Sequence, residues 1–251
     1  MDVFLQRLRQ EYKIAIIATA PSVPVKVLCR GDEEEIEVTT PSKFPTKETI
    51  ITTKEPFVMA TIFSPREYFG DIQKLCMDRR GVQEAMEVVE NRIQFTFKLP
   101  LAEVIFDFFD KLKSISSGYA TFDYGDVEFE ESDIVKVQIL LNGEPADPLS
   151  VIVHRSKAEK MGRDLCVKLK ETLRRQQFEI RIQAAIHNKI IARETIKPFR
   201  KDVTAKCYGG DVSRKRKLLE KQKEGKKRMR SIGEVEVSQE TFMAVTKLGK
   251  D

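Results

Sequence analysis

Apolar and polar residues follow regular periods between residues 55 and 132. Runs of β-branched and aromatic residues predict strands, and apolar residues three or four positions apart predict helices. Pro65 and Pro100 each precede a helical pattern, where a missing N–H costs nothing, and Gly81 is expected to end the first helix. The predicted elements are strand 56–63, helix 65–80, strands 82–89 and 92–99, helix 100–112 and strand 118–124. This order is typical of a ferredoxin-like split βαβ domain, in which two helices cover one face of an antiparallel sheet.

A second unit is predicted from Asp133 onward. Strand 134–141 leads into the hairpin signal Asn142-Gly143. Ser238 precedes a last apolar stretch and is a suitable N-cap for a short helix. Between these features the pattern predicts strand 148–154, helix 157–174 and strands 178–185 and 189–196. The fold class is therefore expected to be α+β throughout.

The first 54 residues are less regular. Residues 1–12 have the spacing of an amphipathic helix whose apolar stripe starts at once, which suggests that the chain begins inside a larger protein. A strand is expected at 14–19, and the prolines in 20–28 favour an extended edge strand. Residues 31–56 are interpreted as a linker with short strands, with the acidic run 32–35 at a solvated hairpin tip.

Positive charge is concentrated in one segment. The chain of 251 residues has a formal net charge of +5, yet residues 213–230 contain ten Lys or Arg against two Glu, a local charge of +8. Such a segment is expected to contact an anionic partner. A solvated, partly disordered basic tail is the alternative. Leu218, Leu219 and Met229 interrupt the charges and favour the first interpretation.

The start of this segment has features of an anion-binding helix. Gly209-Gly210 permits close backbone approach, and Asp211 or Ser213 is a candidate N-cap. The cations that follow oppose the helix macrodipole, so a bound anion explains them better than helix stability does. Gly225 weakens the helix by about 1 kcal/mol relative to alanine and permits a bend. Tyr208 either stacks on a base or covers apolar residues at the helix start.

Residues suited to catalysis are few. The sequence has no phosphate-binding loop, no H-E-x-x-H pair and no G-x-S-x-G elbow. His154 and His187 are expected at a strand end and a turn, where packing or surface roles are more common than catalysis. We therefore predict no catalytic and no metal-ligating residue. The acidic cluster is interpreted as a solvated loop face; it comprises Glu128, Glu130, Glu131 and Asp133.

The cysteines stand singly, so neither a disulfide framework nor a C-x-x-C metal site is predicted. They are Cys29, Cys76, Cys166 and Cys207. Cys207 follows Lys206, but no partner base lies near it in the sequence, so we do not assign it as a nucleophile. No apolar run is long enough to span a bilayer.

The basic segment resembles a known family. The stretch Lys206-Cys-Tyr-Gly-Gly-Asp-Val-Ser-Arg-Lys-Arg-Lys is similar to the signature of the LepA family of ribosomal translation GTPases, also described as back-translocating elongation factors. The family pattern usually has a glycine after Gln183-Ala-Ala-Ile, where this chain has His187, which leaves the local turn geometry open. Other blocks agree in collinear order over essentially the entire chain, among them Ala18-Thr-Ala-Pro-Ser-Val, Arg79-Arg-Gly-Val-Gln, Ser117-Gly-Tyr-Ala-Thr-Phe-Asp-Tyr and Arg175-Gln-Gln-Phe-Glu-Ile.

The resemblance implies a domain order. Residues 1–30 would be the end of a third domain, 31–54 a linker with short strands, and 55–132 a ferredoxin-like domain similar to domain V of elongation factor G. Residues 133–251 would be the family-specific C-terminal domain, with the basic loop and helix at 206–230. The N-terminal GTP-binding domain of the family would be missing, so no cofactor is expected here, and GTP and Mg²⁺ are expected only in that domain.

The resemblance also implies partners. In the family the C-terminal domain reaches toward the peptidyl-transferase region, so the chain would bind large-subunit rRNA and proteins and A-site tRNA. It would act as a monomer without a small-molecule substrate, promoting back-translocation of tRNAs and supporting translation fidelity. The implied RNA contacts, together with Tyr208, are Lys206, Arg214, Lys215, Arg216, Lys217, Lys221, Lys223, Lys226, Lys227 and Arg228. The expected location is the bacterial cytoplasm, at ribosomes or membranes, with the mitochondrial matrix or inner membrane face as the alternative.

Other functions stay open on the sequence alone. A free-standing RNA-binding module without any GTPase domain would carry the same basic segment. An upstream phosphate-loop motif in frame would distinguish the two. An independent enzyme is disfavoured because the sequence contains no recognisable combination of nucleophile, base and metal ligands that could form an active site. From its charge density, the basic segment is expected to be mobile in the free protein.

Overall fold

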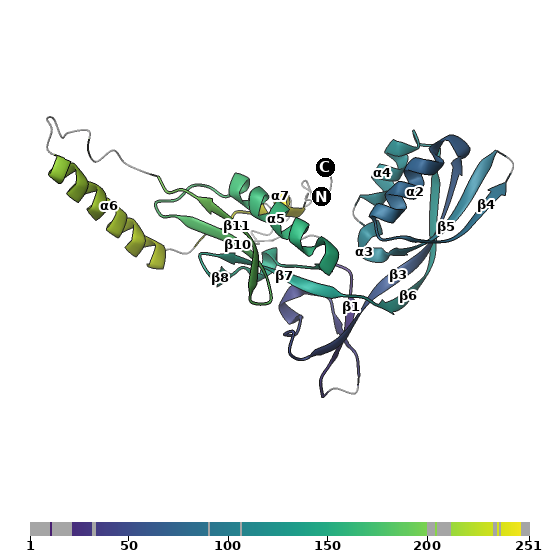
Figure 1. Cartoon of the computed structure of the whole chain (residues 1–251), viewed down its shortest axis with the longest axis horizontal. Helices are drawn as coiled ribbons and strands as arrows, with labels where there is room; N and C mark the ends of the chain where they lie inside the picture. The colour runs from purple at the N-terminus through teal and green to yellow at the C-terminus, as the bar shows by residue number, and fades with distance from the viewer. Residues whose placement is uncertain are drawn as a thin grey trace. The chain divides into compact units, whose positions relative to one another are not determined.

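The computed structural model describes residues 22–31, 34–89, 91–105, 107–199, 212–232 and 237–246, with Glu11, Thr204 and Val235 (Figure 1). These residues form two compact units, one within 21–135 and 152–155 and the other mainly within 136–151 and 156–248. The helix predicted at 1–12, apart from the helical Glu11, and the strand predicted at 14–19 lie outside the described residues.

The first unit contains a six-stranded antiparallel sheet in the order β2-β1-β3-β5-β4, with β6 also paired to β3. Its strands are β1 Val25–Cys29, β2 Ile36–Val38, β3 Ile50–Pro65, β4 Val82–Val89, β5 Arg92–Pro100 and β6 Thr121–Glu131. The start of β3 pairs with β1, and its later residues pair with β5 and β6. The boundary predicted between residues 54 and 55 therefore falls inside one strand. The ferredoxin-like order predicted from the sequence is present in β3 to β6.

Helices cover one face of this sheet (Figure 1). They are the 3-10 turn η2 Arg66–Tyr68 and the helices α2 Phe69–Asp78, α3 Leu101–Val104 and α4 Phe108–Ile115. The core between helices and sheet includes Phe95, Phe97 and Phe108, all fully buried. Burial of each such side chain stabilises the fold by about 1.5–3 kcal/mol. This core fixes which sides of β3 and β5 face inward.

The single helix predicted at 100–112 is wrong, because the chain forms α3 and α4 with a break between them. Asp107 in the break has a φ of −138° and is the N-cap residue of α4. Its side chain makes no capping hydrogen bond to the helix backbone and instead contacts Arg79 and Lys111. Sequence spacing missed the break because Val104, Phe108 and Leu112 keep a four-residue period across it.

Helix α2 ends at Asp78 in a Schellman motif, two residues before the predicted end. Arg80, and not Gly81, adopts the left-handed conformation, with φ of 61°. The N–H groups of Arg80 and Gly81 donate to the carbonyls of Met77 and Cys76, at 3.0 and 2.8 Å. Gly81 is required for space, since a Cβ there would lie 2.6 Å from Leu99 Cδ2 and 2.7 Å from the Cys76 carbonyl oxygen.

The edge strand predicted at 20–28 is wrong, because β1 lies between β2 and β3. Pro24 precedes β1 and removes no hydrogen bond from its ladder, so the proline imposes no edge position. The predicted linker contains β2 and the 3-10 turn η1 Pro41–Lys43. A small separate core, which includes Val27 and Val38, packs beneath these strands.

The second sheet has the order β11-β10-β7-β8, with β9 also on β7. Its elements are β7 Ile134–Leu141, β8 Glu144–Pro145, η3 Asp147–Leu149, β9 Val151–His154, β10 Ile180–Ile186 and β11 Lys189–Ile196. The predicted hairpin turn is confirmed: Asn142 and Gly143 have φ of 56° and 99°, and Leu141 pairs with Glu144 across it.

Helix α5 Arg155–Thr172 packs closely on β10 and β11. Gly162 permits this approach, because a Cβ there would lie 2.6 Å from Ile191 Cδ1 and 3.1 Å from Ala184 Cβ. In the turn between β10 and β11, His187 has φ of 53°. It thus adopts the left-handed conformation that glycine takes at such a position.

The last helix, α7 Gln239–Thr246, begins where the sequence predicts. The Ser238 hydroxyl accepts a hydrogen bond from the N–H of Thr241 at 3.4 Å, so the predicted N-cap is confirmed.

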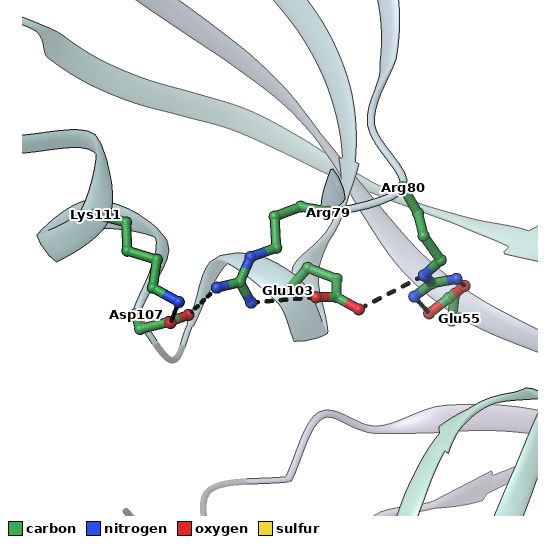
Figure 2. A network of polar contacts seen from close by, with 6 residues as sticks. All are labelled: Glu55, Arg79, Arg80, Glu103, Asp107 and Lys111. Carbon is green, nitrogen blue, oxygen red and sulfur yellow. Dashed lines mark hydrogen bonds and ion pairs between the residues drawn. The ribbon is translucent and has the colours of Figure 1, made fainter. Parts of the chain in front are cut away.

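A network of charged side chains joins β3 to α2, α3 and the start of α4 (Figure 2). Arg79 lies 2.6 Å from Asp107 Oδ1 and 3.4 Å from Glu103 Oε2. Arg80 binds both carboxylate oxygens of Glu55, at 2.7 and 3.0 Å. Glu55 and Asp107 are buried, and buried carboxylates are stable only when such partners satisfy them. The network therefore fixes the ends of these helices relative to the sheet.

Candidate nucleic-acid interface

The basic segment forms one helix, α6 Val212–Ile232, which continues through Gly225 (Figure 1). Its first turn contains Arg214 and Lys215 and no acidic residue. Cations near a helix N-terminus oppose the macrodipole, at a cost of a few tenths of a kcal/mol each. The arrangement thus carries a small cost in the free chain, and an anion bound nearby would remove it.

One side of α6 is turned toward the protein. Lys215, Leu218, Gln222 and Lys226 are the half-buried positions, and they follow one another at intervals of three and four residues. The Lys226 ammonium donates a hydrogen bond to the backbone carbonyl of Phe199, in the segment after β11. Two of the predicted RNA contacts, Lys215 and Lys226, therefore lie on this inner side.

The outer side of α6 presents a row of cations. Arg214, Lys217 and Lys221 are exposed and occur at intervals of three and four residues. At a rise of 1.5 Å per residue the row extends about 10 Å along the helix. Cations in such a row can neutralise phosphates of an RNA backbone, which releases bound counterions.

Two further exposed cations, Arg216 and Lys223, lie on a different strip of the helix. At 100° per residue, Glu220 and Glu224 fall between this strip and the row of Arg214. Arg216 Nε is 3.3 Å from Glu220 Oε1, so its charge is partly offset within the helix. The ion pair with Glu220 lowers the positive charge that this strip presents to a phosphate.

The structure describes only part of the remaining predicted RNA contacts. Lys206 and Tyr208 lie outside the described residues, so the stacking role of Tyr208 stays a prediction. Lys227 and Arg228 belong to α6. Arg228 occupies the register position seven residues after Lys221, two turns along the same row.

The acidic residues at 128–133 lie in and directly after strand β6. Three acidic residues that the sequence assigned to a solvated loop, Glu128, Glu130 and Glu131, lie in β6, so that interpretation is wrong. The predicted loop failed because β6 continues seven residues past the predicted end of the strand, paired along β3. Asp133 does lie in the turn after β6, where it pairs with Arg155.

Within the described ranges, no group of three His, Cys, Asp or Glu side chains has the arrangement of a metal site. Burial raises the pKa of the Cys76 thiol to about 12 and that of the Cys166 thiol to about 11. At neutral pH both thiols are therefore protonated, which makes them poor nucleophiles. Among the helices that the structure describes, none has the length and apolarity to cross a membrane.

Comparison with known proteins matches both parts of the chain. The model of the elongation factor G C-terminus matches residues 52–140, and that of the GTP-binding protein LepA C-terminus matches residues 141–247. Elongation factor 4 from Amoebophilus asiaticus (strain 5a2) is 56% identical over 250 residues, which are 99% of this chain and 42% of that protein. The chain thus spans less than half the length of this relative.

A crystal structure of a protein from Thermus thermophilus shares 24% identity, covers 32% of this chain and 12% of that chain, and has a TM-score of 0.30. That likeness is too weak to bear on the fold. The two adjacent family matches and the identity along nearly the whole chain agree on one assignment. This chain belongs to the LepA family and corresponds to the C-terminal part of its proteins.

Proposed function

We propose that this chain is the ribosome- and tRNA-binding part of a LepA-type translation factor, and that α6 is its main RNA contact. The observation that carries the proposal is the exposed row Arg214, Lys217 and Lys221 on a helix that contains ten cations against two carboxylates. The name of the relative, an elongation factor, supports the ribosome as the site of binding.

The mechanism is non-covalent. Each phosphate that a cation neutralises releases counterions, so affinity depends steeply on salt. Contacts that favour one arrangement of tRNAs over another shift the equilibrium between them by the difference in binding free energy. We propose that this difference, with A-site tRNA and large-subunit rRNA as partners, promotes back-translocation and supports fidelity.

The rest of the parent protein would supply the remaining functions. A GTP-binding domain with its Mg²⁺ would time release from the ribosome, while the ferredoxin-like domain docks on large-subunit rRNA and proteins. The factor would act as a monomer in the bacterial cytoplasm, in agreement with the bacterial source of its relative.

The test is a salt titration of binding between the full chain and purified ribosomes. Combined charge reversal of Arg214→Glu, Lys217→Glu and Lys221→Glu removes three phosphate contacts. The slope of log K against log salt is expected to fall by about two to three, at 0.7 to 0.9 per contact. Binding is also expected to be tighter when the A site holds tRNA.

The matched control reverses three exposed cations of α5, Lys160, Arg163 and Lys170, with the same change in net charge. It is expected to leave most of the slope intact. Equal losses in both triple variants would show general attraction to RNA and would overturn the assignment to α6.

A further inference from the structure

The outer edge of β6 is an open strand edge. β6 pairs with β3 on one side, and within the described residues no strand pairs with its other side. An open edge presents unpaired N–H and C=O groups, and these can pair with an added extended segment. At 11 residues, β6 is long enough to accept such a segment.

This edge is strongly acidic. β6 contains five carboxylates and no Lys or Arg. Glu130 is paired with Lys98, whereas Asp123 and Glu128 are exposed and form no ion pair within the described residues. An acidic edge repels a second copy of itself, because like charges opposite each other in a ladder destabilise it. The same charges attract a strand that carries cations.

The two faces of β6 differ in character. Directly paired residues of neighbouring strands point to the same face. Asp123 pairs with Thr61 and Glu128 with Phe57, on the face opposite the helices. Both carboxylates therefore project from the open face of the sheet.

The helix-side face of β6 is apolar and incompletely covered. Tyr124 pairs with Ala60 and Val127 with Val58, and both Ala60 and Val58 point into the core. Tyr124 and Val127 are nevertheless 53% and 49% exposed. A bulge between the two pairs gives β6 one extra residue, which keeps both side chains on this face.

We infer that the edge of β6 binds an extended protein segment in which basic and apolar residues alternate. Its cations would lie beside Asp123 and Glu128 on the open face, and its apolar side chains beside Tyr124 and Val127 on the helix side. Backbone hydrogen bonds supply affinity in such strand addition, and the alternating side chains supply specificity. The inference uses neither α6 nor ribosome binding, so it stands or falls separately from the proposed function.

The test uses the full chain and a blocked synthetic peptide of alternating lysine and valine. Peptide binding is followed by NMR, with slower hydrogen exchange expected at amides of residues 121–131. The double substitution Asp123→Asn and Glu128→Gln is expected to weaken binding about three- to tenfold, since each removes one exposed charge pair. Asparagine keeps the acceptor for the Tyr124 N–H, which lies 3.0 Å from Asp123 Oδ1.

Matched controls separate strand addition from general attraction. Asp71→Asn with Asp78→Asn removes two exposed carboxylates of α2 and is expected to leave affinity unchanged. A peptide with lysines and valines in separate blocks, one with serine in place of lysine, and one N-methylated along one edge are each expected to bind at least tenfold more weakly. Equal binding of any of these three peptides would overturn the inference.

Discussion

The guanidinium of Arg80 binds both carboxylate oxygens of Glu55, with Nη1 2.7 Å from Oε1 and Nη2 3.0 Å from Oε2. The Glu55 side chain is only 3% exposed. Burial by itself would lower the pKa of Arg80, but the hydrogen bonds and charge of Glu55 hold it above its ordinary value. The pair links Arg80, the left-handed residue of the Schellman motif that ends α2, to β3, so a tertiary contact holds the end of that helix against the sheet.

Replacement of Arg80 by methionine is expected to destabilise the protein by about 3–5 kcal/mol, because it leaves the Glu55 carboxylate buried without its main partner. Adding Glu55→Gln should recover part of this loss, since it removes the buried charge. Calorimetric unfolding of the single and double variants measures both effects. Arg163→Met serves as the control, because Arg163 pairs with Glu159 at the surface and such a pair is worth about 0.3–0.5 kcal/mol. A cost at Arg80 no larger than at Arg163 would contradict the assignment.

Gly81→Ala is expected to cost more than about 2 kcal/mol, because the added Cβ meets Leu99 and the Cys76 carbonyl within 2.7 Å. Gly70→Ala is the matched control. Gly70 lies inside α2, whose last residue is Asp78, and apart from the nearby helix backbone nothing described lies within 4 Å of the added Cβ, so its substitution should stabilise the protein by up to about 1 kcal/mol. Chemical denaturation measures both variants, and opposite signs are expected.

Gly225→Ala tests whether α6 bends when it binds. Among the described residues, nothing beyond the nearby helix backbone lies within 4 Å of the added Cβ, so the substitution should stabilise the helix by about 1 kcal/mol and raise helicity in circular dichroism. The helix is continuous through Gly225 in the structure. We therefore expect ribosome affinity to be unchanged or higher. A marked loss of affinity would show that the bound form of α6 is bent at this residue.

The pKa of His154 is lowered from 6.5, first because burial disfavours the imidazolium and then because Arg80 repels it. Glu55, Asp133 and Glu103 act in the opposite direction without outweighing these effects. The folded protein thus holds this proton less tightly than the unfolded chain does. The contribution of neutral His154 to the free energy of unfolding is therefore fully present above pH 6.5. It is lost as the pH falls below 6.5 and through the lower pKa of the folded protein.

The variant His154→Gln removes this dependence. The unfolding free energy of the wild type, relative to that of the variant, is expected to fall as the pH drops below about 6.5. Denaturant titrations at several pH values measure the difference, in which other titrating groups cancel. A difference that does not change with pH would refute the assignment.

The sequence by itself determined the kinds of elements and most of their order. Periods of two and 3.6 residues are local properties, so β4, β5, β7 and α5 lie close to where they are predicted. The turn signal Asn142-Gly143 and the N-cap Ser238 are local as well, and both hold. The high positive charge of α6 and the resemblance of its sequence to the LepA family could also be recognised from the sequence alone.

Other features of the fold depend on tertiary contacts, which local sequence patterns do not specify. Asp107 at the break pairs with Arg79, Arg80 pairs with Glu55, and β1 lies between β2 and β3. Each of these contacts joins residues that are far apart in the sequence. The candidate interface shows the same limit. From the sequence alone, the cations of α6 cannot be distinguished by exposure. In the structure, Lys215 and Lys226 are half-buried on the inner side of the helix, whereas other cations of α6 are exposed. Charge is a property of a residue, whereas exposure is a property of everything packed around it, and only the folded chain specifies that packing.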